Sequence, residues 1–384
     1  MKLSGYFALN CGKLAVSLFF ILSITSACSA DATNEGIFGK SRTQYVLGQD
    51  GVTPIPITDT QGNKAFFWTF GDTILGTFKE GSEGVSTSDT FNFGESTTME
   101  AMLPNSLAIS EVPDDSNYTN LNFRYLMEDG KVAQFIKYEE GENPFLVRFW
   151  ADDGIQIGNT VYIYYMIIHI DQNAKPYPFK VVGTGLAKWE MPPDWTVDNI
   201  DAIKFTRVKG FQINDIIVGD GAIERNGYVY LLNRIAVDPL HVSLVLARVA
   251  PENIEDPQAY EYLGRSKYAQ KGIWQETPEL FFDDIAGEAS ISYNEKLKKY
   301  VIIYMTISDQ SVVMLTFKNF ATFPAMHKAT TIYKPDSQEE RYYSGKEIFS
   351  TDNFIYAIYI DPSIYQPILL KTSIDNWKAR LGLY

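Results

Sequence analysis

The stretch that decides the fold is GNTVYIYYMII, residues 158–168. It opens on a Gly-Asn turn and continues through β-branched and aromatic residues, which favour extended strands. A polar turn followed by such a run recurs four more times along the chain. The other copies are NKAFFWTFGD (63–72), NGYVYLLNR (226–234), LKKYVIIYMT (297–306) and DNFIYAIYI (352–360).

The spacing of these copies predicts the architecture. Consecutive copies lie 54 to 95 residues apart, which leaves room for one four-stranded sheet with variable loops in each unit. One sheet cannot bury both of its faces, so the sheets would pack around a common axis. We therefore predict an all-β fold, a five-bladed β-propeller, with single helical turns at most in residues 192–204 and 251–263. The alternative is a pair of β-sandwiches, which would lack the longer period.

Composition excludes several classes of function. The 384 residues carry 33 basic and 47 acidic side chains, a formal net charge of −14, which disfavours binding to nucleic acid. Three His and two Cys disfavour a metal site built on these residues. We expect a monomer without a cofactor, and leave open a structural calcium ion on the propeller axis.

The first residues predict export. Lys2 and Lys13 precede an 11-residue apolar run, residues 14–24. This run is too short to span a bilayer and fits a secretion signal. Small residues then precede Cys28, as in a bacterial lipoprotein cleavage box. We predict a signal peptide over 1–27, a lipid anchor on Cys28, a tether over 28–40 and the propeller over 41–384. The protein would then be membrane-anchored and face the periplasm or the cell surface.

Acidic residues beside glycine recur at similar points of the units. Glycine lets the backbone and a ligand approach each other closely, so such carboxylates stay uncrowded. Acids that converge on one channel repel one another, which raises some pKa values and leaves other groups ionised. Glycoside hydrolysis needs that combination, although Asp-Gly and Gly-Asp are also common turn pairs. These acids are Asp50, Asp72, Asp152, Asp153, Asp220 and Glu288.

Other side chains are candidates for substrate binding. Trp150 precedes Asp152 and Asp153, so a sugar face could stack on its ring, while core packing is the alternative. Arg225, Arg234 and Arg248 could bind hydroxyl groups or hold carboxylates, while surface or structural ion pairs are the alternative for each. We include Asp152 and Asp220 in this substrate-binding set.

Several of these motifs resemble one family of secreted bacterial proteins. The resemblance covers residues 42 to 380 and concerns the family long called domain of unknown function 4185. It implies a five-bladed propeller similar to furanosidases, and some members are endo-D-arabinofuranases of glycoside hydrolase family 183. The motifs are GQDG (48–51), WTFGDT (68–73), FWADDG (149–154), GDGAIERNGYVY (219–230), LARV (246–249), DPQAYEY (256–262) and GEASISYN (287–294).

The resemblance also implies site residues and a substrate. Asp50 and Asp72 match two aspartates of the first blade, and we expect them to be the catalytic pair. Asp153 and Glu288 match further acidic positions of the catalytic pocket. The implied activity is the hydrolysis of a furanoside polysaccharide such as arabinan. The alternative is a glycan-binding or scaffold propeller without catalysis, in which these acids only hold turns or sugar hydroxyls.

Overall fold

The computed structural model describes residues 32–39, 45–79, 97–175, 177–238, 241–266, 271–323, 329–336 and 341–383. Strands dominate these ranges, in which one α-helix occurs, α2 (Ile374–Leu381). The predicted all-β class is therefore confirmed. No helix within these ranges is long and apolar enough to cross a membrane. Short 3-10 turns lie in the two stretches predicted to hold single turns, at Ile200–Ala202, Pro251–Asn253 and Pro257–Ala259.

Five antiparallel sheets of four or five strands make up most of the described chain. The first contains β3 (Thr53–Thr58), β4 (Lys64–Phe70), β7 (Ser106–Ser110) and β8 (Arg124–Tyr125). The second contains β11 (Val147–Ile157), β12 (Thr160–Ile170), β13 (Phe179–Glu190) and β14 (Thr206–Arg207). The third contains β15 (Ile217–Arg225), β16 (Tyr228–Asp238), β17 (His241–Val249), β18 (Glu261–Arg265) and β19 (Gly272–Gln275).

The fourth and fifth sheets follow in chain order. Two smaller sheets are formed by strands that lie before, between or after the strands of the first sheet in the sequence. The fourth sheet contains β20 (Ser290–Asn294), β21 (Lys299–Met305), β22 (Val312–Phe317) and β23 (Thr330–Tyr333). The fifth contains β24 (Tyr343–Ser350), β25 (Phe354–Asp361), β26 (Gln366–Ser373) and β1 (Thr33–Ile37). The smaller sheets contain β2 (Val46–Gln49), β5 (Thr73–Phe78) and β6 (Thr97–Leu103), and β9 (Met127–Glu128) and β10 (Lys131–Val132).

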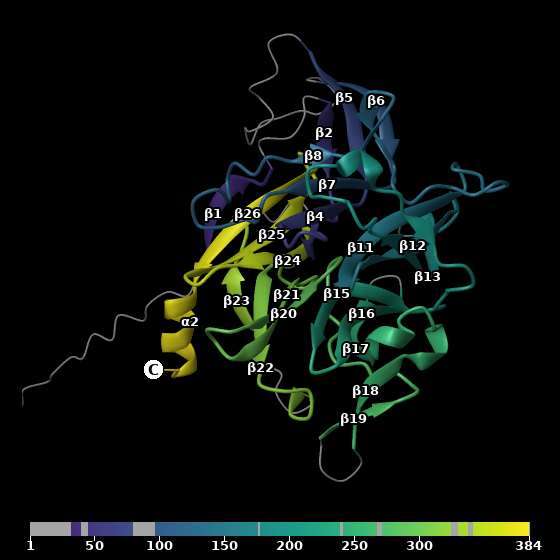
Figure 1. The fold of residues 1–384 in the computed structure, drawn as a ribbon. Coiled ribbons are helices and arrows are strands. Elements are labelled where there is room, and N and C mark those ends of the chain that lie inside the picture. The colour runs from purple at the N-terminus through teal and green to yellow at the C-terminus, as the bar shows by residue number, and fades with distance from the viewer. Residues whose placement is uncertain are drawn as a thin grey trace, which may run out of the picture.

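The first strands of the five large sheets form a ring. Strand β3 contacts β11, β11 contacts β15, β15 contacts β20, β20 contacts β24, and β24 returns to β3. Figure 1 shows the sheets spreading outward around this centre, with the β5–β6 hairpin projecting at the top. This is the arrangement of a β-propeller, in which every sheet packs against its neighbours. The five-blade count remains a prediction for the whole chain, and the five sheets described here fit it.

Each of the five recurring motifs forms the second strand of its sheet. These strands, β4, β12, β16, β21 and β25, are covered on both faces by the neighbouring sheets, which explains their nearly continuous apolar runs. The cluster between the first and second sheets, for example, contains Phe67, Leu107, Phe149 and Ile163, all buried. The first strands approach closely at the centre, where a Cβ on Gly221 would lie 2.7 Å from the Ile291 nitrogen.

The predicted tether over residues 28–40 is wrong for its central part. Residues Thr33–Ile37 form β1, which pairs antiparallel with β26 and completes the fifth sheet. The stretch looks like a tether because an edge strand is held through its backbone, and its residues are polar or glycine except for the buried Ile37. The folded domain therefore begins before residue 41. The predicted signal peptide and Cys28 lie outside the described residues.

Candidate active site

Two of the predicted acids, Asp50 and Asp72, lie next to each other where the chain enters and leaves the first sheet. Asp50 links β2 to β3, and Asp72 links β4 to β5. The two links are joined by backbone hydrogen bonds, from Asp50 N to the Asp72 carbonyl at 3.3 Å and from Gly71 N to the Asp50 carbonyl at 3.0 Å. A Cβ on Gly71 would lie 2.5 Å from Asp50 Oδ1, so glycine is needed here to admit the carboxyl group.

The Asp50 carboxyl group is arranged to hold a proton near neutral pH. Its Oδ2 accepts hydrogen bonds from the hydroxyl groups of Tyr343 at 2.9 Å and Tyr365 at 2.8 Å. Burial, followed by the charges of Asp72 and Glu288, raises the pKa of Asp50 to about 8, although the two phenols act in the opposite direction. At pH 7 the protonated form therefore predominates.

Asp72 has a different environment. Its Oδ1 accepts from Arg148 Nη1 at 2.8 Å and from Trp150 Nε1 at 3.1 Å. Both donors come from β11, two residues apart, so they project from the same side of that strand. Burial raises the pKa of Asp72, while the Arg148 charge and the two hydrogen bonds favour the ionised form. The pKa of both acids is therefore raised, but their surroundings differ, because Asp72 has the Arg148 cation beside it and Asp50 accepts from neutral phenols.

A second group of charges lies deeper among the first strands. Asp220 pairs with Arg234, and both side chains are almost fully buried. Lys346 is also buried and donates from Nζ to Thr53 Oγ1 at 2.8 Å. Both carboxyl oxygens of Asp152 are buried with no hydrogen-bond partner among the described residues, and burial and then Asp220 raise its pKa well above the usual range. We call Asp152, Asp220, Arg234 and Lys346 the axial cluster.

The remaining predicted acids differ in their surroundings. Asp153 accepts from the backbone nitrogens of Gly154 at 2.7 Å and Ala222 at 2.8 Å, so it links β11 to β15. Burial raises the pKa of Asp153 to about 7. Glu288 acts electrostatically on Asp50 and on the axial cluster, and its Oε2 is buried without a described partner. Glu288 therefore lies within electrostatic reach of both the pair and the axial cluster, whereas Asp153 is held by backbone donors.

Two of the predicted substrate-binding arginines lie in structural contacts away from the carboxyl pair. Arg225 pairs with Glu295 at 3.1 Å and packs over a tyrosine ring. Arg248 pairs with Glu261 at 2.8 Å and packs over two aromatic rings. Arg225 ends β15, five residues after Asp220, which places it about 16 Å along the strand. The contacts of these two residues fit the alternative of a structural ion pair, and Arg234 pairs with Asp220.

Three residues of the site were not predicted: Tyr343, Tyr365 and Lys346. Lys346 follows Gly345 at the start of the fifth sheet, where earlier sheets place a glycine beside an acid, so a search for charge of either sign beside glycine would have found it. Tyr365 has a left-handed backbone with φ of 52°. Such strain in a residue other than glycine is frequent at functional sites, but it is visible only in the structure.

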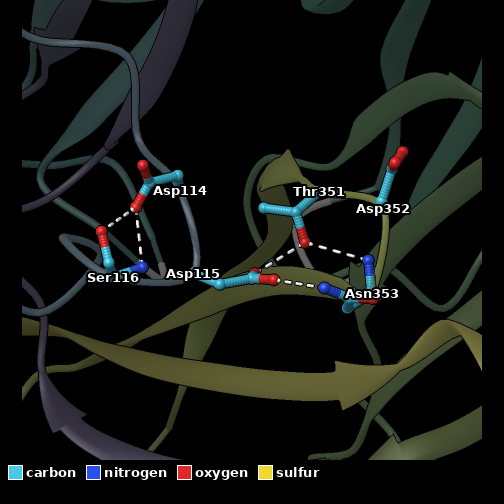
Figure 2. Close-up of a pocket in the computed structure, with 6 residues that line it drawn as sticks. All are labelled: Asp114, Asp115, Ser116, Thr351, Asp352 and Asn353. Carbon is cyan, nitrogen blue, oxygen red and sulfur yellow. Dashed lines mark hydrogen bonds between the residues drawn. The ribbon is translucent and has the colours of Figure 1, made fainter.

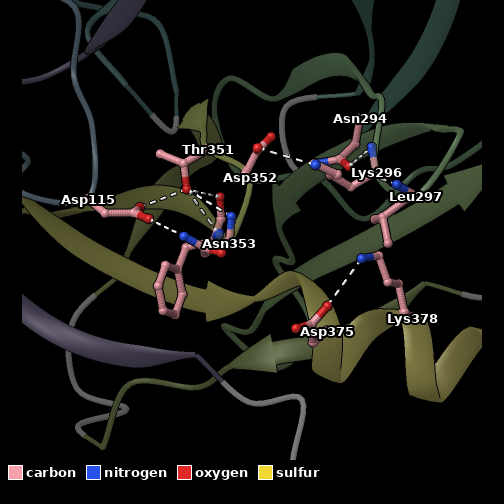
Figure 3. Close-up of polar contacts among 10 residues, drawn as sticks. Asp115, Asn294, Lys296, Leu297, Thr351, Asp352, Asn353, Asp375 and Lys378 are labelled. Carbon is pink, nitrogen blue, oxygen red and sulfur yellow. Dashed lines mark hydrogen bonds and ion pairs between the residues drawn. The ribbon is translucent and has the colours of Figure 1, made fainter.

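An open hollow of about 350 Å³ lies elsewhere on the surface and shares no residue with the carboxyl pair. Figure 2 shows that its acids are bound locally: Asp115 accepts from Thr351 Oγ1 and Asn353 Nδ2, each at 2.7 Å. Burial acts to raise the pKa of Asp115, but these hydrogen bonds outweigh it and the pKa is lowered. Asp352 of its lining pairs with Lys296 at 3.2 Å, and Figure 3 also shows Lys378 paired with Asp375 on α2. The pKa values of Asp114 and Asp115 are lowered, whereas those of Asp50 and Asp72 are raised.

Within the described ranges, no group of three or more His, Cys, Asp or Glu side chains is arranged to hold a metal ion. The positive charges that face the axial acids come from Arg234 and Lys346, which act on Asp152 and Asp220.

Sequence comparison decides the family. The model of the family described as "Domain of unknown function (DUF4185)" matches residues 51–379. This chain belongs to the DUF4185 family. The match confirms the resemblance drawn from the sequence motifs, and it contains every predicted acid except Asp50, which lies one residue before its start. No curated protein matches the sequence.

Solved structures share the fold of this DUF4185 protein. A presumed hydrolase from Bacteroides ovatus aligns with a TM-score of 0.61 and 14% identity over 89% of both chains. A GH43_1 enzyme from Xanthomonas citri aligns with a TM-score of 0.47 and 10% identity, over 90% of this chain and 92% of its own. An α-L-arabinofuranosidase from Lactobacillus brevis aligns with a TM-score of 0.44 and 10% identity, over 88% and 92%. At 14% identity, the similarity to the Bacteroides ovatus protein concerns the fold alone.

Proposed function

We propose that this protein is a glycoside hydrolase that cleaves furanoside polysaccharide of the arabinan type by endo attack. The observation that carries the proposal is the Asp50–Asp72 pair, two adjacent buried carboxyl groups with raised pKa values, of which Asp72 is paired with Arg148. Glycoside hydrolysis requires one carboxylic acid and one carboxylate beside the scissile bond. The family resemblance supplies the furanoside substrate, and the Bacteroides ovatus neighbour is described as a presumed hydrolase.

In this proposal Asp50 is the general acid. A pKa of about 8 keeps its proton available at neutral pH, and the proton passes to the departing glycosidic oxygen. Asp72 remains a carboxylate beside Arg148 and acts as the base for an attacking water or as the nucleophile. Retaining enzymes hold the two carboxyl groups about 5 Å apart and inverting enzymes about 6.5–9.5 Å. The anomeric configuration of the first product, measured by NMR, distinguishes the two courses.

The test compares Asp50→Asn and Asp72→Asn with the wild-type protein on arabinan, D-arabinan, arabinogalactan and galactan, with analysis of the released sugars. Loss of a positioned acid or base typically costs about 10²–10⁴-fold in rate. The matched control is Asp283→Asn, a substitution of the same kind at an exposed position outside the pair. Undiminished turnover by folded Asp50→Asn and Asp72→Asn would remove the pair from catalysis.

A second candidate function is glycan binding without hydrolysis. The observation that favours it is the engagement of Asp153 by backbone donors and of Asp220 by Arg234, since acids held in this way serve structure. If the protein only binds glycan, it should be retained on the same polymers without releasing sugar. The wild type and Asp50→Asn should then be retained equally.

We also propose that the protein is exported and anchored in a membrane through lipid on Cys28. The support is the apolar run over residues 14–24 and the small residues before Cys28. Labelling of cells with a fatty-acid analogue tests it: label is expected on the wild type and not on Cys28→Ser.

A further inference from the structure

Exposed apolar side chains gather at one end of the second sheet. Phe145 is 84% exposed, Leu146 55% and Tyr177 51%. They come from two chain segments that the sheet brings together, because the Ile170 nitrogen donates to the Leu146 carbonyl at 2.9 Å and Ile170 pairs with Phe179. The two segments therefore meet at the same end of β11, β12 and β13. A concentration of large exposed apolar side chains at one end of a sheet marks an interaction site.

Aromatic rings connect this end of the second sheet to the carboxyl pair. Tyr177 and Phe179 stack with ring centroids 5.6 Å apart and an interplanar angle of 16°. Phe179 meets Trp150 edge-to-face at 4.9 Å. Trp150 in turn donates its indole N–H to Asp72. The three rings thus form a row that begins at a proposed catalytic carboxylate and ends at an exposed tyrosine.

The two inner rings of the row, Trp150 and Phe179, pack on buried side chains. Trp150 and Phe179 pack, with Ile170, on a small cluster formed by the buried side chains of Met166, Ile168 and Ile217. Met166 also contacts Arg234 of the axial cluster through its sulfur at 3.8 Å. A supported row of rings costs little conformational entropy when a ligand binds, so it suits recognition better than flexible side chains.

We propose that Trp150, Phe179 and Tyr177, with Phe145 and Leu146 beside them, form a platform that binds several consecutive sugar units of an uncharged furanoside polymer on one side of the cleaved bond. Aromatic rings present a large apolar surface with a defined geometry, which complements the C–H faces of sugars. The formal charge of −14 disfavours a polyanionic ligand. A row of three rings is longer than one sugar, so a polymer is a better ligand than a disaccharide. This inference rests on the proposed function for the position of the cleaved bond.

The test measures binding separately from hydrolysis. All variants are made in the Asp50→Asn protein. Binding is measured as the retardation of each protein's electrophoretic migration in gels that contain arabinan, D-arabinan or arabinogalactan. Tyr177→Ala removes a half-exposed ring and is expected to weaken binding to the preferred polymer about three- to tenfold, while Tyr177→Phe keeps the ring and most of the binding. The control is Ile273→Ala, which removes a 41%-exposed side chain from β19 of the third sheet and leaves binding unchanged.

The outcomes separate the platform from the proposed hydrolysis. Equal retardation of Tyr177→Ala and its parent, or retardation on none of the three polymers, overturns the platform. A Tyr177→Ala protein that changes only its sedimentation, with no change in polymer binding, identifies a protein contact and also overturns it. Retardation that depends on Tyr177 in a protein whose wild type releases no sugar supports the platform and rejects the hydrolase. Sugar release combined with retardation independent of Tyr177 rejects the platform alone.

Discussion

The Asp50–Asp72 pair and the axial cluster show how similar sequence signals lead to different chemistry. Both contain acids beside glycine at the inner end of a sheet. In the axial cluster, Asp220 is buried against Arg234, and Lys346 lies nearby. In the pair, Asp50 accepts from two neutral phenols, and Asp72 stays 14% exposed. Asp220 is thus fixed in an ion pair, whereas burial and the neighbouring carboxyl groups keep a transferable proton on Asp50.

The largest expected effect separates the two regions by activity. Under the proposed function, Asp50→Asn lowers kcat on the preferred furanoside polymer by about 10²–10⁴-fold, because no proton reaches the leaving oxygen. In the wild type, kcat is expected to fall as the pH rises through about 8, where Asp50 loses its proton. Steady-state kinetics between pH 5 and 9 measure both effects. A rate that keeps rising up to pH 9 would contradict Asp50 as the acid.

The next effect separates the regions by stability. Asp220→Asn leaves the buried Arg234 charge without its carboxylate and is expected to lower the free energy of unfolding by about 3–5 kcal/mol. Asp72→Asn also removes the partner of an arginine, but that arginine is 24% exposed, so a smaller loss is expected. Urea unfolding followed by tryptophan fluorescence compares the two variants. Equal losses would show that burial does not distinguish the regions.

A third prediction concerns Glu347, a buried acid on β24 that accepts from Ser292 Oγ at 2.7 Å. Burial raises its pKa from 4.5 to about 7 in the folded protein. Between these values the unfolded chain ionises first, so stability present below pH 4.5 is lost as the pH rises to about 7. The loss amounts to about 3 kcal/mol. Glu347→Gln should match the wild type near pH 4.5 and exceed it in unfolding free energy at pH 8. Parallel pH profiles of the two proteins would disprove this.

A smaller effect is expected from the phenols beside Asp50. Tyr365→Phe removes a donor that favours the ionised carboxylate, so the pKa of Asp50 rises. The alkaline limb of the plot of kcat against pH should then move to higher pH by up to about one unit. Asp115→Asn in the surface hollow is the control, and its profile should overlay that of the wild type. A shift of the limb to lower pH in Tyr365→Phe would reverse the assigned role of the phenol.

Much of the fold was predictable because it depends on local pattern. The second strand of every large sheet is one of the five recurring motifs, and strands buried on both faces must be apolar along their whole length. Strand β1 could not be found in this way, since Thr33–Ile37 is held by backbone hydrogen bonds to β26 that leave no side-chain signature. The acids of the site were predictable as residue types, but Arg225 and Arg248 show that residue type alone does not assign a role.

The sequence by itself determined the all-β class, the family and the set of acids near the centre, because periodicity, glycine placement and composition are properties of short stretches. Only the tertiary structure decided which acid holds a proton. The phenols on Asp50 come from residues 293 and 315 positions away, and the cations of the axial cluster come from the third and fifth sheets. A pKa depends on burial and on charges within a few ångströms, and these exist only once distant segments have packed together.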